Sequence, residues 1–299
     1  MNEDYILSPS QGVSIYINPA ERNLGDFTVR RFLPHHMQRK VGPFVFFDHM
    51  GPAVFAPGQG IDIRPHPHVC LATITYLFEG SILHRDSLGF VQEILPGEVN
   101  WMTAGRGIVH SERTSAAARS TGQVLHGLQL WVALPEESEE IAPEFFHYER
   151  EAIPTLHHEN TTMRLIAGSA FGETSPVRTY SRLFYLDVEI PESGTAGLPG
   201  DYSERGIYII SGSVDIAGAS MDAGTMAVLD EVGSVEITAA RDSRLVMFGG
   251  DPITERYLEW NFVASNRKRI EQAKDDWRNN RFPVIQDDAE EYIPLPAES

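Results

Sequence analysis

The stretch HPHVCLATITYLFEGS, residues 66–81, decides the fold. It opens on His66-Pro67-His68, continues as an apolar run rich in β-branched and aromatic residues, and ends at Gly80. A run of this kind bounded by glycine is typical of a β-strand. Residues i and i+2 of an extended strand point to the same face, so we expect both histidines to face one side of a sheet.

A second pair with the same spacing is His110-Ser111-Glu112, which follows the turn-rich segment 103–107. Two such pairs on neighbouring strands would bring three imidazoles and one carboxylate to one point. That set suits a divalent transition metal and leaves about two of six octahedral positions open for a substrate. The alternative is that these are ordinary hydrogen-bonded side chains, as most histidines are.

Composition indicates a globular chain of one large domain or two ordinary ones. Among its 299 residues, 42% are hydrophobic, and no run of 18 apolar residues marks a membrane span. Residues Met1 to Asp4 lack the basic and apolar regions of a signal peptide, and Cys70 is the single cysteine. We therefore expect a cytoplasmic protein without disulfides.

The net charge is strongly negative, at a formal −18. Binding to nucleic acid depends largely on neutralising phosphates with basic side chains, so direct binding is disfavoured. An acidic surface keeps a protein dispersed and says little about its other partners.

Strand-like segments dominate the first half of the chain. They are short, rich in β-branched and aromatic residues and bounded by Gly, Pro or Asp, which predicts an all-β sandwich or barrel. The acidic, proline-bounded segment 135–154 is interpreted as a linker or covering segment. The expected strands are 44–47, 69–78, 90–95, 98–103 and 125–134.

A second β-rich block, residues 182–248, repeats part of the first. The segment 76–82 matches 208–214 at an offset of 132, and 96–98 matches 223–225 at an offset of 127. The alternative is a strand-turn-strand habit shared by chance. A true duplication predicts two barrels in tandem.

The two blocks differ in their histidines, because all eleven lie at or before His158. The offsets carry each expected ligand to a residue that cannot bind a metal. We therefore expect one barrel with a metal site and one filled with apolar side chains. The mapped pairs are His66 to Leu198, His68 to Gly200, His110 to Ile237 and Glu112 to Ala239.

The C-terminal part predicts a helix over residues 264–280. Ile270, Ala273 and Trp277 follow at i, i+3 and i+7, and Ser265 is the expected N-cap. We expect this helix to lie across a barrel and the acidic tail beyond Asp287 to form an extended strap.

The chain resembles the pirin family of the cupin superfamily. The run Trp101 to Glu112 is long and specific, and the resemblance covers most of the chain. The other segments that carry it are 46–52, 66–68, 76–80, 128–132, 264–267 and Trp277.

This resemblance implies two cupin-type, jelly-roll β-barrels in tandem with a C-terminal helix packed against them. We expect a metal-binding domain at 1–140, a second cupin domain without ligands at 155–255, and the helix and tail at 256–299. The family's ligands carry over to His66, His68, His110 and Glu112. One ion per chain is implied, iron(II) first, with zinc, nickel, manganese or copper as alternatives.

Two functions follow from the resemblance. Some pirins resemble quercetinases, dioxygenases that use oxygen to open the flavonol ring and release carbon monoxide, with Glu112 as the general base. Other pirins resemble metal- or redox-dependent regulators that bind a transcription factor or an enzyme without turnover. The sequence predicts the dioxygenase first.

One segment departs from the family. Pirins commonly continue their His-x-His with Arg-Gly-Phe-Glu, where this chain has Val69-Cys70-Leu71-Ala72. The departure predicts a more apolar mouth beside the metal and a different substrate preference.

Other residues remain secondary candidates. Cys70 is expected to be a buried small hydrophobe rather than a redox-sensitive thiol or metal ligand. His126 is expected in the core, the alternative being a partner behind a ligand. Arg106 either steers an anionic substrate or packs in a turn. The pairs His35-His36 and His157-His158 are expected on the surface and in a loop, respectively.

Overall fold

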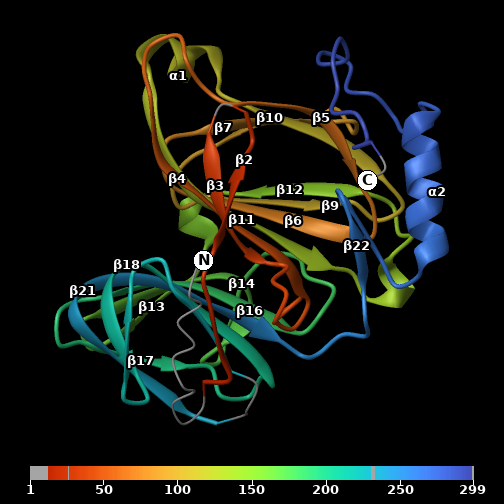
Figure 1. Ribbon diagram of the computed structural model, residues 1–299. Helices are drawn as coiled ribbons and strands as arrows, with labels where there is room; N and C mark the ends of the chain where they lie inside the picture. Colours follow the sequence, from red (N-terminus) through yellow and green to blue (C-terminus); the bar gives the residue numbers. More distant parts are fainter. Residues whose placement is uncertain (1–12, 26, 230–232, 298–299) are drawn as a thin grey trace, which may run out of the picture. The chain divides into compact units, whose positions relative to one another are not determined.

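The computed structural model describes residues 13–25, 27–229 and 233–297. Strands dominate these ranges and only two short α-helices accompany them, which confirms the all-β expectation (Figure 1). Residues Met1 to Asp4, which bear on the signal-peptide expectation, lie outside the described ranges. Neither helix in the described chain is long and apolar enough to cross a membrane.

Two compact units make up the described chain. The first unit comprises residues 21–31, 45–150 and 254–297, and the second comprises residues 13–20, 32–44 and 151–253. The C-terminal segment therefore belongs with the unit that contains the paired histidines. The contiguous boundaries expected from the sequence stay a prediction.

The first unit is built on two sheets, a seven-stranded one in the order β12-β9-β6-β11-β4-β3-β2 and a four-stranded one in the order β5-β10-β7-β8. Their neighbouring strands run antiparallel where the register is defined. All five expected strands are present in this set. The bounds are β2 Ala20–Asn23, β3 Thr28–Leu33, β4 Phe44–Phe55, β5 Asp62–His68, β6 Leu71–Glu79, β7 Ile82–Asp86, β8 Val91–Ile94, β9 Val99–Thr103, β10 Ile108–Arg113, α1 Ala116–Thr121, β11 Gln123–Ala133 and β12 Glu144–Tyr148.

The second unit is built on one ten-stranded sheet that curls around an apolar core. Its main path is β1-β20-β18-β21-β16-β14-β13, with β15, β17 and β19 paired at its sides. The bounds are β1 Ile15–Ile17, β13 Thr155–His158, β14 Thr161–Ala170, β15 Glu173–Thr174, β16 Leu183–Ile190, β17 Thr195–Leu198, β18 Glu204–Ile216, β19 Ala219–Asp222, β20 Met226–Leu229 and β21 Val235–Gly250.

The internal repeat is confirmed by equivalent hydrogen bonds. In the first unit the backbone N–H of Gly97 donates to the carbonyl of Leu77 at 3.0 Å, and in the second Gly224 donates to Ile209 at 2.8 Å. These pairs are related by the offsets 127 and 132. Both glycines have positive φ, 85° and 88°, a conformation that other residues adopt only at a cost.

The register corrects part of the mapping between the units. His110 lies opposite His66 in the β10–β5 pair, and Ile237 lies opposite Ala196 in the β21–β17 pair. His66 and His68 therefore correspond to Ala196 and Leu198, two residues before the expected positions. The offsets came from β6 and β9, whereas the connection after β5 is two residues longer in the second unit.

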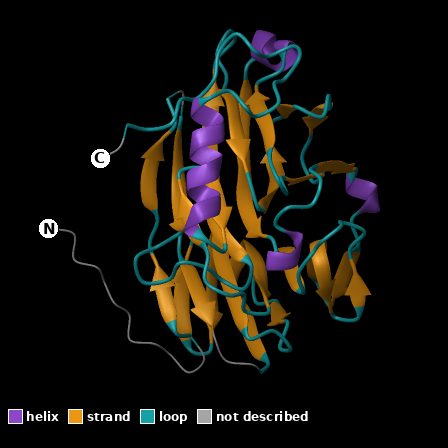
Figure 2. Ribbon diagram, turned by 90° about the vertical axis from the view of Figure 1, so that its right-hand side faces the viewer, coloured by secondary structure: helices purple, strands orange, loops and turns teal. Residues whose placement is uncertain are grey.

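The C-terminal helix packs on the first unit, as expected. Helix α2, Arg267–Arg278, follows the hairpin of β22 (Tyr257–Glu259) and β23 (Phe262–Ala264), and it lies lengthwise over the strands (Figure 2). Ile270 and Ala273 are buried against Val69 and Phe262.

The N-cap of α2 differs from the prediction. Asn266 caps the helix, because its side chain accepts from the backbone N–H of Arg269 at 3.0 Å. Ser265 instead bonds the carboxylate of Glu139, through its backbone N–H at 2.7 Å and its hydroxyl at 2.9 Å.

The acidic segment 135–154 is not a linker. It contains β12, which pairs with β9 and so extends the seven-stranded sheet, and two short 3-10 helices, Glu136–Ser138 and Arg150–Ala152. The buried Phe145 anchors β12. The proline and glutamate content of the segment favours a linker, whereas its apolar Phe145 indicates a buried strand.

Candidate metal centre

Three of the predicted ligands come together between the sheets of the first unit. His66 and His68 project from β5 and His110 from β10, and each is buried. One potential ligand atom of each lies within 4.8 Å of the others. Nε2 of His68 lies 3.1 Å from Nε2 of His110. The ring of His66 lies 5.0 Å from that of His68 and 4.4 Å from that of His110.

Backbone carbonyls orient two of these rings. His66 donates from Nδ1 to the carbonyl of Arg64 at 2.9 Å, and His68 donates from Nδ1 to the carbonyl of Asn261 at 3.0 Å. A neutral imidazole that donates from Nδ1 keeps its lone pair on Nε2. Both rings are therefore held as acceptors with Nε2 available to a cation, as metal-binding histidines usually are.

The local sequence explains this arrangement. β5 is an edge strand, where prolines such as Pro65 and Pro67 are tolerated although they cannot donate to a ladder. The β5–β10 register shifts between His110 and Glu112. Such a bulge re-aims backbone groups, and here the carbonyl of Arg64 meets the His66 ring.

Burial lowers the pKa of all three histidines. The pKa of His66 falls to about 4, mainly because desolvation penalises the charged ring. The pKa values of His68 and His110 lie well below the usual value for the same reason, reinforced by the neighbouring histidines. The three rings are thus neutral at pH 7, which is the state that binds a metal.

Glu112 is buried on β10 but is held by a different set of contacts. Its carboxylate accepts from Nε2 of Gln129 at 2.9 and 3.0 Å and from the hydroxyl of Thr75 at 3.4 Å. It is not in the group of the described chain whose ligand atoms lie within 4.8 Å of one another. Burial raises the pKa of this carboxyl, although both hydrogen bonds oppose the effect.

Several residues around the centre escaped the sequence analysis. His84-Arg85-Asp86 on β7 has the same i, i+2 spacing as the two recognised pairs, and its ring contacts His110. That spacing was the signal that could have revealed it. Gln129, Thr75 and Trp131 come from the opposite sheet, and the Trp131 ring lies 5.0 Å from that of His68. No spacing in the sequence relates them to the histidines.

The departure at residues 69–72 lies in the interior of the first unit. All four side chains are fully buried, and Val69 and Cys70 pack against Phe262 and helix α2. The expected effect of this departure on the mouth of the site and on substrate preference stays a prediction. The expectation for Cys70 is confirmed, since burial raises the pKa of its thiol to about 12 and leaves it unreactive.

The remaining candidates lie outside the cluster. His126 lies at the edge of the core: it is partly buried, its Nε2 lies 2.8 Å from Nε2 of His49, and its ring contacts that of Phe78. Arg106 is exposed and its carbonyl accepts from Arg269. His36 is exposed and His35 partly so, whereas His157 and His158 are exposed on β13 instead of in a loop.

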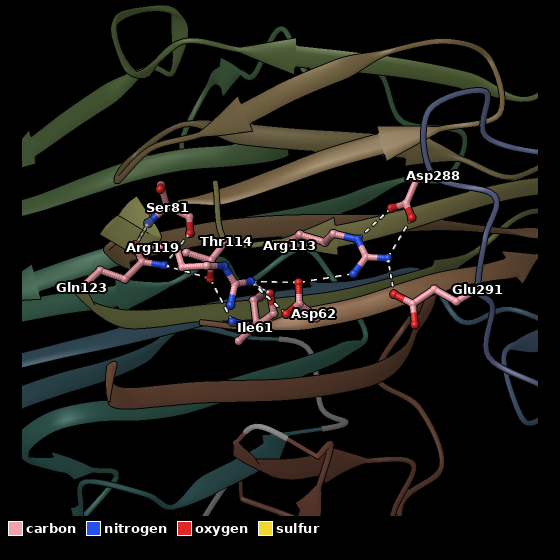
Figure 3. Close-up of polar contacts among 9 residues, drawn as sticks. All are labelled: Ile61, Asp62, Ser81, Arg113, Thr114, Arg119, Gln123, Asp288 and Glu291. Atoms are coloured by element: carbon pink, nitrogen blue, oxygen red, sulfur yellow. Dashed lines mark hydrogen bonds and ion pairs between the residues drawn. The ribbon is translucent and has the colours of Figure 1, made fainter. Parts of the chain in front are cut away.

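The acidic tail forms the expected strap across the first unit. Arg113 of β10 donates to Asp288 at 2.7 and 2.8 Å and to Glu291 at 2.9 Å (Figure 3). The backbone N–H of Ile293 donates to the carbonyl of Pro65 at 2.9 Å. The strap is thus tied to both strands that carry the three histidines.

The donor set fits a transition metal. Neutral imidazoles are the preferred ligands of iron, zinc, nickel and copper, and two of the three here have oriented Nε2 atoms. The buried carboxylate of Glu112, on the same strand as His110, supplies an oxygen donor. Hard ions such as calcium prefer oxygen ligands alone.

Comparison with known proteins agrees with this fold and site. The family model described as Pirin matches residues 26–132, and the Pirin C-terminal cupin domain matches residues 185–283. A pirin-like protein of Caulobacter vibrioides is 48% identical over 95% of this chain and 99% of its own length. Pirin of Homo sapiens is 31% identical over 91% of this chain and 94% of its own.

A solved structure is also similar to this chain along nearly its whole length. Quercetin 2,3-dioxygenase from Acinetobacter baumannii aligns with a TM-score of 0.88 and 33% identity, over 97% of this chain and 96% of its own. These matches define a protein with two cupin domains, as expected from the sequence. The chain belongs to the pirin family.

Proposed function

We propose that this chain binds one divalent transition metal ion, natively iron(II), and acts as a dioxygenase on flavonols such as quercetin. The reaction would consume oxygen, open the flavonol ring and release carbon monoxide. The cluster of His66, His68 and His110 carries the proposal. The similarity to the quercetin 2,3-dioxygenase of Acinetobacter baumannii supports the reaction class.

We assign the three histidines as fixed ligands and Glu112 as the fourth ligand and the general base. The bound metal would supply Lewis acidity that favours ionisation of the substrate hydroxyl. Glu112 accepts the proton of the flavonol 3-hydroxyl, as a buried carboxylate beside the histidine cluster is placed to do. Gln129 and Thr75 hold its carboxylate in place.

The test is oxygen uptake by the iron-loaded protein in the presence of quercetin, with carbon monoxide as the second readout. Glu112→Gln should retain metal but lose about 10²- to 10⁴-fold in turnover, the usual contribution of a general base. The glutamine amide keeps the shape of the carboxylate. The side-chain amide of Gln129 can rotate so that its oxygen accepts from the new N–H group.

The matched control is Gln123→Glu, which changes a side-chain amide of the same strand β11 that bonds Ser81, outside the cluster. It should leave turnover close to that of wild type, because the substituted residue makes no contact with the reacting groups. Absence of oxygen uptake with iron-loaded wild type and any flavonol would instead favour a metal-dependent regulator without turnover.

We also propose a cytoplasmic location. The one cysteine is buried and carries no disulfide, which fits a reducing compartment.

A further inference from the structure

We infer that His84 and Asp86 act as positioning residues that hold His110 with its Nε2 atom turned toward the other two histidines. The inference rests on the proposed role of His110 as a metal ligand. It assigns a task to a buried pair that the proposed reaction does not otherwise use.

The pair lies on the strand beside His110. In the antiparallel β7–β10 ladder, Asp86 stands opposite His110 and His84 opposite Glu112. Side chains opposite one another across a ladder share a face. His84 and Asp86 are both buried, and the His84 ring stacks on Phe145 at 4.3 Å with the planes 12° apart.

Asp86 is fixed before it meets the histidine. Its Oδ1 atom accepts from the backbone N–H groups of Leu88 at 2.9 Å and Phe90 at 3.1 Å. Its Oδ2 atom is then left for Nε2 of His84, which lies 3.1 Å away. A carboxylate can only accept, so the His84 proton sits on Nε2 and the lone pair on Nδ1.

That lone pair faces His110. Nδ1 of His84 lies 3.5 Å from Nδ1 of His110, and the ring centroids are 5.3 Å apart. His110 donates from Nδ1 to this lone pair, which leaves its own lone pair on Nε2. That Nε2 atom is the one that lies 3.1 Å from His68.

All three histidines of the cluster therefore donate from Nδ1 to a fixed acceptor. His66 and His68 use backbone carbonyls, whereas His110 uses a side chain that a carboxylate holds in one tautomer. Outer partners of this kind typically contribute 10- to 100-fold to metal affinity. Only the third acceptor can be removed by substitution.

The test is titration of the metal-free protein with cobalt(II), followed by the visible absorption of the bound ion. Asp86→Asn keeps an oxygen for Leu88 and Phe90 but presents an N–H to His84. His84 must then carry its proton on Nδ1, and two N–H groups face each other unless His110 moves its own proton to Nε2. We expect cobalt to bind about 10- to 100-fold more weakly, with an altered spectrum.

Asp215→Asn is the matched control. The Asp215 carboxylate accepts from the backbone N–H of Gly218 at 2.8 Å in an exposed turn of the second unit. This variant should bind cobalt like wild type. Should Asp86→Asn fail to fold, His84→Phe decides, because phenylalanine keeps the ring on Phe145 and removes the acceptor.

Two results distinguish a failure of this inference from a failure of the proposed function. Cobalt affinity within twofold of wild type and an unchanged spectrum in the folded variants would overturn the positioning role. Undiminished cobalt binding by His110→Ala would instead overturn the ligand assignment of the proposed function, and the inference with it.

Discussion

The two units share the turn after their central strand but differ in the side chains behind it. In both, a left-handed glycine donates to a carbonyl of that strand, Gly97 to Leu77 and Gly224 to Ile209. The strand registers on either side of this turn define which residues of the two units are equivalent. His110 opposite His66 becomes Ile237 opposite Ala196, and Glu112 opposite His84 becomes Ala239 opposite Val214.

The exchange extends to the facing sheet. Thr75 pairs with Gln129 in the first unit, and Ile207 pairs with Met247 at the same place in the second. The second unit thus has apolar residues at the positions equivalent to Thr75 and Gln129, the two residues that bond Glu112 in the first unit. The apolar residues all belong to the core of the second unit, as the sequence predicted for Ile237 and Ala239.

This pattern has a physical reason. A buried carboxylate without donors costs several kcal/mol, and so does a buried amide without partners. A polar interior is therefore kept complete or replaced as a whole. The two units teach that the site is a network of histidines, carboxylates and their donors rather than four separable ligands.

The largest effect should come from removing a ligand. His68→Ala deletes an imidazole whose Nε2 atom lies 3.1 Å from Nε2 of His110. We expect metal affinity to fall by more than about 100-fold, beyond the loss caused by an outer partner. Isothermal titration with iron(II) or cobalt(II) measures it.

Leu198→Met is the control at the equivalent position of the second unit. Leu198 is a buried core residue there, and a swap that conserves volume usually costs less than about 1.5 kcal/mol. Metal affinity should not change. A loss of metal with this variant would contradict the division of labour between the units.

The reverse substitution should destabilise the second unit. Ile237→His places an imidazole in an apolar core where no partner has been built for it. We expect the free energy of unfolding to fall by about 2–4 kcal/mol, the cost of a cavity combined with an unsatisfied polar group. Denaturant titration measures it, with Ile237→Val, at about 0.5–1.5 kcal/mol, as the comparison.

That variant should also fail to gain metal affinity. A variant that bound a second equivalent of metal would show that one histidine suffices, against the network interpretation.

Acid should destabilise the first unit through its neutral histidines. Burial lowers the pKa of His66 to about 4, against about 6.5 in the unfolded chain. At a pH between these two values, His66 binds a proton in the unfolded state but not in the folded state. Stability is therefore complete above pH 6.5 and is lost as the pH falls toward 4.

The expected loss from His66 alone is about 1 kcal/mol by pH 5.5 in metal-free protein. Denaturant titrations at pH 7.5 and 5.5 should show a smaller difference for His66→Leu than for wild type. Equal differences would mean that His66 is not the titrating group.

Spacing along single strands was enough to predict much of this site. It identified His66, His68 and His110 because i, i+2 pairs share a face, and the same rule applied to β7 would have added His84 and Asp86. Gln129 lies across the barrel from Glu112, and only the folded sheets bring them together.

Errors in the fold had local causes. The N-cap was placed one residue early because Ser265 and Asn266 are both good caps, and a tertiary bond to Glu139 occupies the serine. The charge of segment 135–154 suggests a linker or covering segment, but Phe145 is buried in strand β12, which pairs with β9.

The smallest effect concerns Cys70, which stands where the family commonly has glycine. Its φ is 58°, in the left-handed region that costs a side chain about 1–2 kcal/mol.

Cys70→Gly should relieve this strain while losing a small buried side chain, so we expect a change within about 1 kcal/mol. Cys70→Ala keeps the strain and loses the same thiol. At an ordinary buried strand position glycine is less stable than alanine by about 0.5–1 kcal/mol, whereas here it should equal or exceed it. Denaturant midpoints of the two variants decide the matter, because a glycine variant clearly weaker than the alanine one would mean that the backbone at residue 70 carries no strain.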